Sequence, residues 1–388
     1  MLRPTAIVSL LLIGCGSPSS EPLAPDVGTM GNVDSMPTGP DAAFDVRQDT
    51  RVDCHIAQTD GSICSCTEVG QRPPTLYLLL DRSGSMNDPA PGSMRSKWSL
   101  VRSALLDKDK GALRQLGGRL TLAAAWFPSP SMSDECNAGK QVFGPLRGSV
   151  SVYDELEAKL AAAIPRGATP TAASLRAVEA TIATMPQPAY VLLATDGAPN
   201  CGSEMCTADA CTYNIDGAVV LAGKCDAALN CCDPGKSAQG LGWKGCVDLD
   251  PTAKAAADIA AAGHKVFVLG VPGLNAAYAR ALDAIAVAGG AARDGSPRYY
   301  AATEPTQESL TAALTSIAGK VVDTCSIQLE SPIPEPGVTN VLLDGEAVTD
   351  WKWTSDSNIE LTGPSCARIH AGKVASLQVV VGCKTVTK

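Results

Sequence analysis

The chain has 388 residues, which is enough for two or three domains that each bury a hydrophobic core. Hydrophobic residues make up 45% and aromatic residues only 4%, while Gly (36) and Pro (27) are frequent, so part of the chain is expected in loops and linkers. The formal net charge of −9 and the lack of a basic stripe exclude nucleic acid as the expected partner, because binding to phosphates rewards clustered Lys and Arg.

Residues 1–15 have the pattern of a bacterial lipoprotein signal peptide. Arg3 is followed by an apolar run that is too short to span a bilayer, which takes roughly 20 residues. The run ends in Leu-Ile-Gly-Cys (12–15), which resembles the lipobox, where the signal is cut before a cysteine that then carries the lipid. Cys15 is therefore the predicted membrane anchor, and Gly16 after it favours the outer membrane. The alternative is an ordinary signal peptide followed by an unrelated cysteine.

The cysteine count favours disulfides. Of the 15 cysteines one is Cys15, which leaves 14, an even number that suits a disulfide framework in the periplasm or on the cell surface. A zinc site is the competing interpretation, but the sequence has no CxxC pair, and its three His residues are far apart.

The first part of the mature chain is expected to contain little regular structure. Residues 16–52 are rich in Ser, Pro, Gly and Asp and contain few large apolar residues, which predicts a flexible tether. Residues 53–74 contain Cys54, Cys64 and Cys66 and are expected to form a small loop-rich patch that clasps the following domain.

Strand and helix patterns alternate over residues 75–323, which predicts an α/β domain with a mostly parallel sheet and helices on both faces. The expected strands are 76–80, 120–127, a short edge strand at 150–152, 190–195, 266–271 and 298–301, and the expected helices are 97–107, 156–164, 175–182, 276–288 and 310–321.

Two insertions interrupt this alternation, at 128–148 and 197–250. Each follows a predicted strand, so both are expected at the same edge of the sheet if those strands are parallel. The larger insertion contains seven cysteines, which cannot all pair among themselves. We therefore predict a disulfide from Cys136, in the smaller insertion, to a cysteine of the larger one.

Residues 324–388 predict a small antiparallel β module. An Asp-Gly turn (344–345) follows an apolar strand, Trp351 and Trp353 alternate with polar residues, and 377–381 has a further strand pattern. The expected disulfide staples of this module are Cys325, Cys366 and Cys383.

Three polar loops follow strands or open helices in the α/β domain. Asp81-Arg82-Ser83-Gly84-Ser85 ends the first buried strand, 167–171 opens a helix, and Thr195-Asp196-Gly197 ends another strand. Ligands of open α/β sheets bind at the carboxyl ends of the strands. Hydroxyl and carboxylate oxygens suit Mg²⁺, Mn²⁺ or Ca²⁺ and do not suit Zn²⁺. The alternative is that Ser83 and Ser85 only cap a helix and a turn.

The segments LYLLLDRSGSM (76–86), GATPT (167–171) and YVLLATDG (190–197) resemble the metal-ion-dependent adhesion site of von Willebrand factor type A (vWA) domains. The resemblance covers residues 75–323 and implies a doubly wound sheet. The cysteine-rich insertion has no counterpart in the compact members of that family.

The resemblance also implies a role for each site residue. Ser83 and Ser85 ligate the metal through their hydroxyls, Thr169 adds a third hydroxyl directly or through water, and Asp81 and Asp196 act mainly through waters and hydrogen bonds. Such an ion keeps much of its positive charge, so that a Glu or Asp carboxylate of a partner protein completes its coordination shell.

The sequence therefore favours a cell-envelope lipoprotein that binds an acidic protein partner through a divalent cation, in an adhesion or scaffold role. A disulfide-hardened structural envelope protein with a non-functional metal site is the alternative. An enzyme is less favoured, because no Ser-His-Asp or Cys-His grouping is evident.

Overall fold

The computed structural model describes residues 54–57, 63–129, 135–185, 189–202, 206–208, 210–211, 231–233, 235, 242–274, 276–322, 325–370, 373–374 and 376–386. Cys15, the predicted signal peptide, the predicted tether and much of the insertion at 197–250 lie outside these residues. Within the described part of the chain, no helix is both long enough and apolar enough to cross a bilayer.

A six-stranded sheet forms the centre of the α/β domain, with the strand order β6-β5-β4-β7-β8-β9. Neighbouring strands from β5 to β9 are parallel, and β6 runs antiparallel to β5 at one edge. The chain passes from β4 to β5 on one side and later returns to β7 on the other side, so the sheet is doubly wound. The strands are β4 (Thr75–Asp81), β5 (Thr121–Phe127), β6 (Lys140–Arg147), β7 (Ala189–Thr195), β8 (Lys265–Gly270) and β9 (Tyr300–Ala301).

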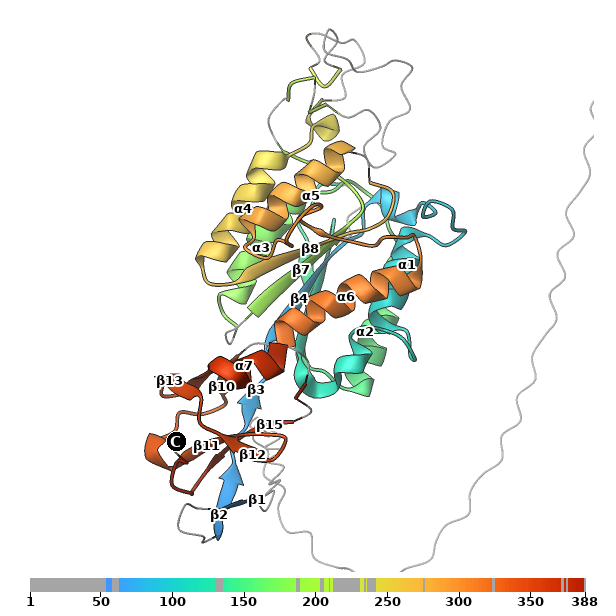
Figure 1. Cartoon of the computed structure of the whole chain (residues 1–388). Helices are drawn as coiled ribbons and strands as arrows, with labels where there is room; N and C mark the ends of the chain where they lie inside the picture. The colour runs from blue at the N-terminus through green and yellow to red at the C-terminus, as the bar shows by residue number, and fades with distance from the viewer. Residues whose placement is uncertain are drawn as a thin grey trace, which may run out of the picture. The chain divides into compact units, whose positions relative to one another are not determined.

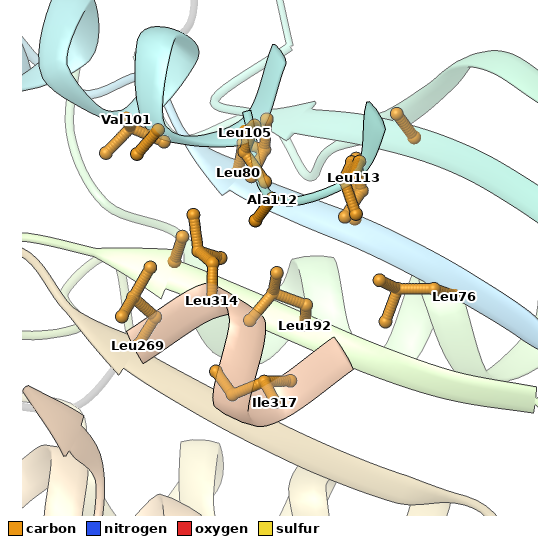
Figure 2. Close-up of a cluster of buried hydrophobic side chains, with 14 of the residues drawn as sticks. Leu76, Leu80, Val101, Leu105, Ala112, Leu113, Leu192, Leu269, Leu314 and Ile317 are labelled. Atoms are coloured by element: carbon orange, nitrogen blue, oxygen red, sulfur yellow. The ribbon is translucent and has the colours of Figure 1, made fainter. Parts of the chain in front are cut away.

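Helices cover both faces of this sheet (Figure 1). Every residue of β4 is buried, and successive side chains enter opposite cores: Leu78 packs with one cluster and Leu79 with the other. Figure 2 shows the first cluster, where Leu80 of the sheet lies near Leu105 of a covering helix. One face carries α1 (Lys97–Leu106), α2 (Val150–Ala162) and α6 (Gln307–Val322), and the other carries α3 (Thr171–Ile182), α4 (Leu249–Ala261) and α5 (Ala276–Ala288). The predicted α/β fold class is confirmed.

The predicted edge strand at 150–152 is wrong, because these residues begin α2. Ser149 caps this helix: its hydroxyl accepts a hydrogen bond of 3.3 Å from the backbone N–H of Val152. Tyr153 and Leu156 then continue its buried face. The edge strand beside β5 is β6, which lies within the segment that we expected to be an insertion.

Helix α4 was not predicted either. Its sequence, LDPTAKAAADIAA, buries Ala255, Ala256 and Ile259 against the sheet. Alanine marks a buried helix face less distinctly than leucine does, and the helix starts inside the range that we assigned to the insertion at 197–250.

An antiparallel β module follows the α/β domain, as predicted. Asp344 and Gly345 have positive φ angles of 55° and 85°, which is the geometry of a type I′ hairpin turn between β11 and β12. The module has two sheets, ordered β1-β2-β15-β11-β12 and β13-β14-β10-β3. Its elements are β1 (Cys54–Ala57), β2 (Ile63–Glu68), β3 (Gln71–Arg72), β10 (Ser326–Leu329), β11 (Thr339–Leu343), β12 (Glu346–Val348), β13 (Trp351–Ser355), β14 (Asn358–Leu361), α7 (Gly363–His370) and β15 (Leu377–Val381).

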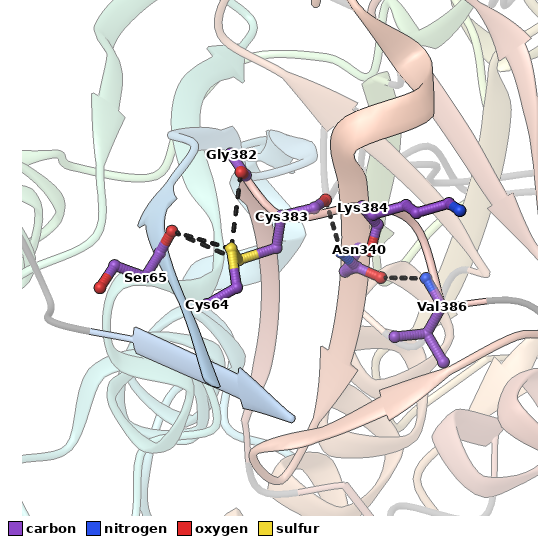
Figure 3. The surroundings of a disulfide bond; sticks show 7 residues. All are labelled: Cys64, Ser65, Asn340, Gly382, Cys383, Lys384 and Val386. Carbon is purple, nitrogen blue, oxygen red and sulfur yellow. Dashed lines mark hydrogen bonds between the residues drawn. A yellow bond between two sulfur atoms is a disulfide. The ribbon is translucent and has the colours of Figure 1, made fainter. Parts of the chain in front are cut away.

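The lead-in at 53–74, which we expected to clasp the following domain, instead supplies strands to this module. β2 pairs with β15, β3 pairs with β10, and a disulfide joins Cys64 to Cys383. Figure 3 shows the surroundings of this bond, where the Asn340 side chain donates to the carbonyl of Cys383 over 3.1 Å and accepts from the N–H of Val386 over 2.7 Å. A second disulfide, Cys325–Cys366, lies in the same module. The module is thus built from both ends of the described chain.

Candidate metal centre

The predicted site residues meet at the carboxyl edge of the sheet, where the chain leaves the neighbouring strands β4 and β7. Leu80 is paired with Ala194, so Asp81 lies beside the end of β7. Asp81, Ser83 and Thr169 are fully buried, and Asp196 is 2% exposed. Only Ser85, in the short 3-10 helix Gly84–Asn87, is half-buried.

Asp81 is held by hydrogen bonds to both of its carboxylate oxygens. The backbone N–H of Ser83 donates to Oδ1 over 2.8 Å, and the hydroxyl of Thr195 donates to Oδ2. The Asp81 carboxylate is therefore held in one orientation at the base of the site. We did not single out Thr195 from the sequence, although it stands directly before Asp196.

The two serines and Asp196 form a hydrogen-bonded chain. The hydroxyl of Ser85 donates to Oδ1 of Asp196 over 2.9 Å, and the hydroxyl oxygens of Ser83 and Ser85 lie 3.1 Å apart. Because the proton of Ser85 points to the carboxylate, Ser83 is the donor to Ser85. A hydroxyl oxygen that donates its one proton can still ligate a cation through a lone pair.

Thr169 is fixed by the loop after β7. Its N–H donates to Oδ1 of Asn200 over 2.8 Å, and the N–H of Asn200 donates to the Thr169 carbonyl over 3.0 Å. The N–H of Gly84 donates to the carbonyl of Gly167 over 2.9 Å, which joins the Thr169 loop to the serine loop. Gly167 has a φ of 89°, which favours glycine at this position. Asn200 is a site residue that sequence reasoning missed, because a lone Asn in a loop follows no pattern.

Arg82 lies within the motif, but its side chain contacts other elements. It is 3% exposed, and its guanidinium donates to the carbonyl oxygens of Pro128 and Ile164. Burial and the nearby charge of Arg166 lower the pKa of Arg82. Arg82 therefore fastens the serine loop to the ends of β5 and α2.

A second residue that sequence reasoning missed is Lys97, the first residue of α1. Its ammonium Nζ lies 2.6 Å from Oδ2 of Asp196. A cation is unfavourable at the first position of a helix, where the helix dipole is positive. A lysine at the start of a helix is therefore unusual, and this feature of the sequence could have identified Lys97 as a site residue.

The predicted disulfide between the two insertions is confirmed: Cys136 is bonded to Cys201. Cys201 directly follows Asn200, and the carbonyl of Glu135 accepts a hydrogen bond of 3.1 Å from the N–H of Ala168. The bond therefore joins two segments that both contact the Thr169 loop. Within the larger insertion, two further disulfides join Cys206 to Cys246 and Cys211 to Cys232.

Two groups of side chains have the composition of a soft-metal site, but their cysteines are oxidised. These groups are Cys206, Cys211 and Cys232, and Cys325, Cys366 and His370. Each of these cysteines is in a disulfide and offers no thiolate. The donors at the carboxyl edge of β4 and β7 are hydroxyl and carboxylate oxygens, and this set fits a hard cation such as Mg²⁺.

Comparisons with known protein families and with characterised protein sequences give no match. Among solved structures, the pilus adhesin SpaC from Lactobacillus rhamnosus GG is 14% identical, with a TM-score of 0.43, over 84% of this chain and 39% of that chain. The vWF domain of the pili tip protein Mfa5 from Porphyromonas gingivalis is 13% identical, with a TM-score of 0.38, over 65% of this chain and 95% of that one. BatB from Bacteroides thetaiotaomicron is 13% identical, with a TM-score of 0.39, over 65% of this chain and 100% of that one. This chain thus spans well under half of SpaC, and at these identities the likeness concerns the fold alone.

Proposed function

We propose that this chain is a cell-envelope lipoprotein whose vWA-type domain binds a divalent cation and uses it to hold an acidic side chain of a partner protein. The observation that carries the proposal is the hydrogen-bonded chain from Ser83 through Ser85 to Asp196. It gathers two hydroxyl oxygens, which are suitable ligands for a hard cation, close to two buried carboxylates, Asp81 and Asp196.

In this proposal, Ser83, Ser85 and Thr169 hold the ion through their hydroxyls. Asp81 and Asp196 accept hydrogen bonds from their neighbours, so they contribute negative charge and orient the hydroxyls and waters around the ion. Mg²⁺ is the favoured ion, with Mn²⁺ and Ca²⁺ as alternatives. When bound with few direct carboxylate ligands, the ion supplies a positive charge that attracts the carboxylate of a partner.

The proposed location rests on three features. The lipobox-like run supports a lipid on Cys15, and the disulfides of the described residues suit an oxidising compartment. Residues 16–52 then serve as the tether that carries the folded part away from the membrane. Gly16 after Cys15 favours the outer membrane, and the metal site would be available to a partner in the periplasm or at the surface.

Calorimetric titration of the Cys15→Ser mature chain with Mg²⁺ and Mn²⁺ tests the metal site. We expect binding to one site, weakened about tenfold to a hundredfold in Asp81→Asn and Thr169→Val. Thr181→Val is the matched control, because this threonine lies on α3 and its hydroxyl donates to its own helix, at Ala177. Melting in EDTA shows whether each variant is folded.

Folded wild-type protein that binds neither ion contradicts the proposal and favours the disulfide-hardened structural protein. If the ion binds, immobilised mature chain in Mg²⁺ is used to capture partners from envelope extracts, and elution with EDTA identifies those held through the ion. Retention of every partner in EDTA contradicts the proposed role of the cation.

A further inference from the structure

We infer that Lys97 is an internal counter-ion of Asp196, which keeps the affinity of the site for its cation low until an acidic partner arrives. The inference rests on the proposed function. It adds a way in which the binding of the cation and the binding of the acidic partner depend on each other. It starts from the ion pair itself, in which Nζ of Lys97 lies 2.6 Å from Oδ2 of Asp196.

This ion pair is shielded from water. The Lys97 side chain is 10% exposed and that of Asp196 is 0% exposed. Bulk water screens surface pairs strongly, and a pair buried to this extent interacts far more strongly than an exposed one. Breaking a buried pair by removing one partner leaves an uncompensated charge, which is strongly destabilising. Lys97 is therefore part of the environment that a cation entering the site would meet.

The position of Lys97 is fixed by two segments of the chain. Its backbone N–H donates to the carbonyl of Asp88 over 3.0 Å, which closes the loop between the motif and α1. Its side-chain stem passes Gly273, in the loop after β8: a β-carbon built on Gly273 would lie 3.2 Å from Cε of Lys97. Gly273 has a φ of +113°, so glycine suits both the backbone and the close approach.

Both carboxylate oxygens of Asp196 are engaged within the protein. Oδ1 accepts from the hydroxyl of Ser85 over 2.9 Å, and Oδ2 accepts from Lys97. Asp196 consequently acts on a cation through Ser85 or through water, with its charge largely balanced by the ammonium.

The positive charge of Lys97 next to the site should affect how tightly the site binds a divalent cation. A neighbouring positive charge opposes the entry of a dication, so metal alone binds weakly. A carboxylate from a partner adds the missing negative charge, so metal and carboxylate each strengthen the binding of the other by the same factor. Lys97 thereby makes occupancy of the site depend on the acidic partner.

The test compares Lys97→Met with the Cys15→Ser mature chain that is otherwise wild type. Mg²⁺ affinity is measured by calorimetry with and without acetate as the carboxylate probe, at constant ionic strength. We expect Lys97→Met to bind Mg²⁺ alone about tenfold more tightly, since it removes one unit of positive charge next to the site. We also expect acetate to strengthen Mg²⁺ binding by a smaller factor in Lys97→Met than in wild type.

Lys254→Met is the matched control, because Lys254 is paired with Asp258 on the exposed surface of α4 and should leave both affinities unchanged. Lys97→Gln serves if the Met variant does not fold, since Gln keeps a hydrogen-bond donor for Asp196 without the charge. Melting in EDTA provides a readout that does not involve metal: loss of Lys97 should lower the melting temperature and loss of Lys254 should not.

Mg²⁺ binding that is weaker or unchanged in folded Lys97 variants overturns the inference and leaves the proposed function standing. A Lys97 variant that melts like wild type in EDTA also overturns it, because Asp196 would then need no counter-ion. Absence of Mg²⁺ binding in wild type and all variants overturns the proposed function and the inference together.

Discussion

The hydroxyl of Thr195, the last residue of β7, donates to the Oδ2 oxygen of Asp81, the last residue of β4. The two strands are parallel neighbours, so this bond joins two of the site loops at the points where they leave the sheet. Both residues are at least 99% buried, and a buried acceptor that loses its donor keeps the full cost of its desolvation.

Thr195→Val should therefore lower the free energy of unfolding by about 1–3 kcal/mol, because Asp81 loses one donor. Urea unfolding in EDTA measures this effect without a contribution from metal. Thr195→Ser, which keeps the hydroxyl, should recover most of the loss. Equal unfolding of the Val and Ser variants would show that the bond does not hold Asp81.

The Cys136–Cys201 disulfide should support the Thr169 loop as well as global stability. We expect the double variant Cys136→Ala/Cys201→Ala to lose about 2–4 kcal/mol of stability and to bind Mg²⁺ more weakly. Removing Cys325–Cys366 from the β module should lower stability with unchanged Mg²⁺ affinity. Calorimetry and urea unfolding of both double variants separate the two effects, and equal Mg²⁺ affinities would contradict a supporting role for Cys136–Cys201.

Asp248 gives a prediction about pH. Its carboxylate is buried near Asn200 and Gly202, and its Oδ2 has no hydrogen-bond partner among the described residues. Burial raises the pKa of Asp248 to about 6, and a backbone hydrogen bond from Gly202 offsets part of this rise. The folded state therefore holds this proton more tightly than the unfolded state, whose ordinary value is 3.8.

Because the folded state binds the proton more tightly, Asp248 makes stability fall as the pH rises from about 4 to about 6. Asp248→Asn removes this slope and should be more stable than wild type above pH 6, by up to about 3 kcal/mol. Urea unfolding of both proteins at intervals from pH 4 to pH 7 measures the difference, in which other titrating groups cancel. A constant difference across that range would contradict the raised pKa.

The predicted lipid anchor is tested in cells of the source type or a bacterial host that processes lipoproteins. Wild-type chain should incorporate a labelled fatty acid and sediment with membranes, because acyl chains hold it there. Cys15→Ser should carry no label and appear in the soluble fraction. A wild-type chain that carries no label and fractionates like Cys15→Ser would point to the alternative, an ordinary signal peptide followed by an unrelated cysteine.

The sheet was predictable because its central strands carry their signal locally. The runs in β4 and β7 are apolar over nearly their whole length, which is what a strand buried on both faces requires. Two polar motifs stand at the ends of these strands, so the topology alone brings Asp81 and Asp196 together. The loop that contains Thr169 could be predicted as part of the site because it directly precedes a helix, α3.

Other parts depended on tertiary context that no local pattern reports. The β-branched residues Val150 and Val152 favour a strand, but the cap from Ser149 and the buried residues that follow fix a helix there. Lys97 and Asn200 belong to the site only because folding places them beside Asp196 and Thr169. The partners of β2 and β3 lie more than 250 residues further along the chain, at 380–381 and 328–329, and a short strand does not specify its neighbour.

The order of the elements also determines how the protein would carry a mechanical load. Strands β2, β3 and β4 are consecutive elements, and β4 ends at Asp81. The N-terminal side of the chain is therefore connected to the candidate metal centre by a short stretch of backbone. Tension between the N-terminal side and a partner held through the proposed cation would pull β4 lengthwise between β5 and β7. Its ladder bonds on both sides would then be sheared together instead of opening one after another. The Cys64–Cys383 bond would keep the module closed under the same pull.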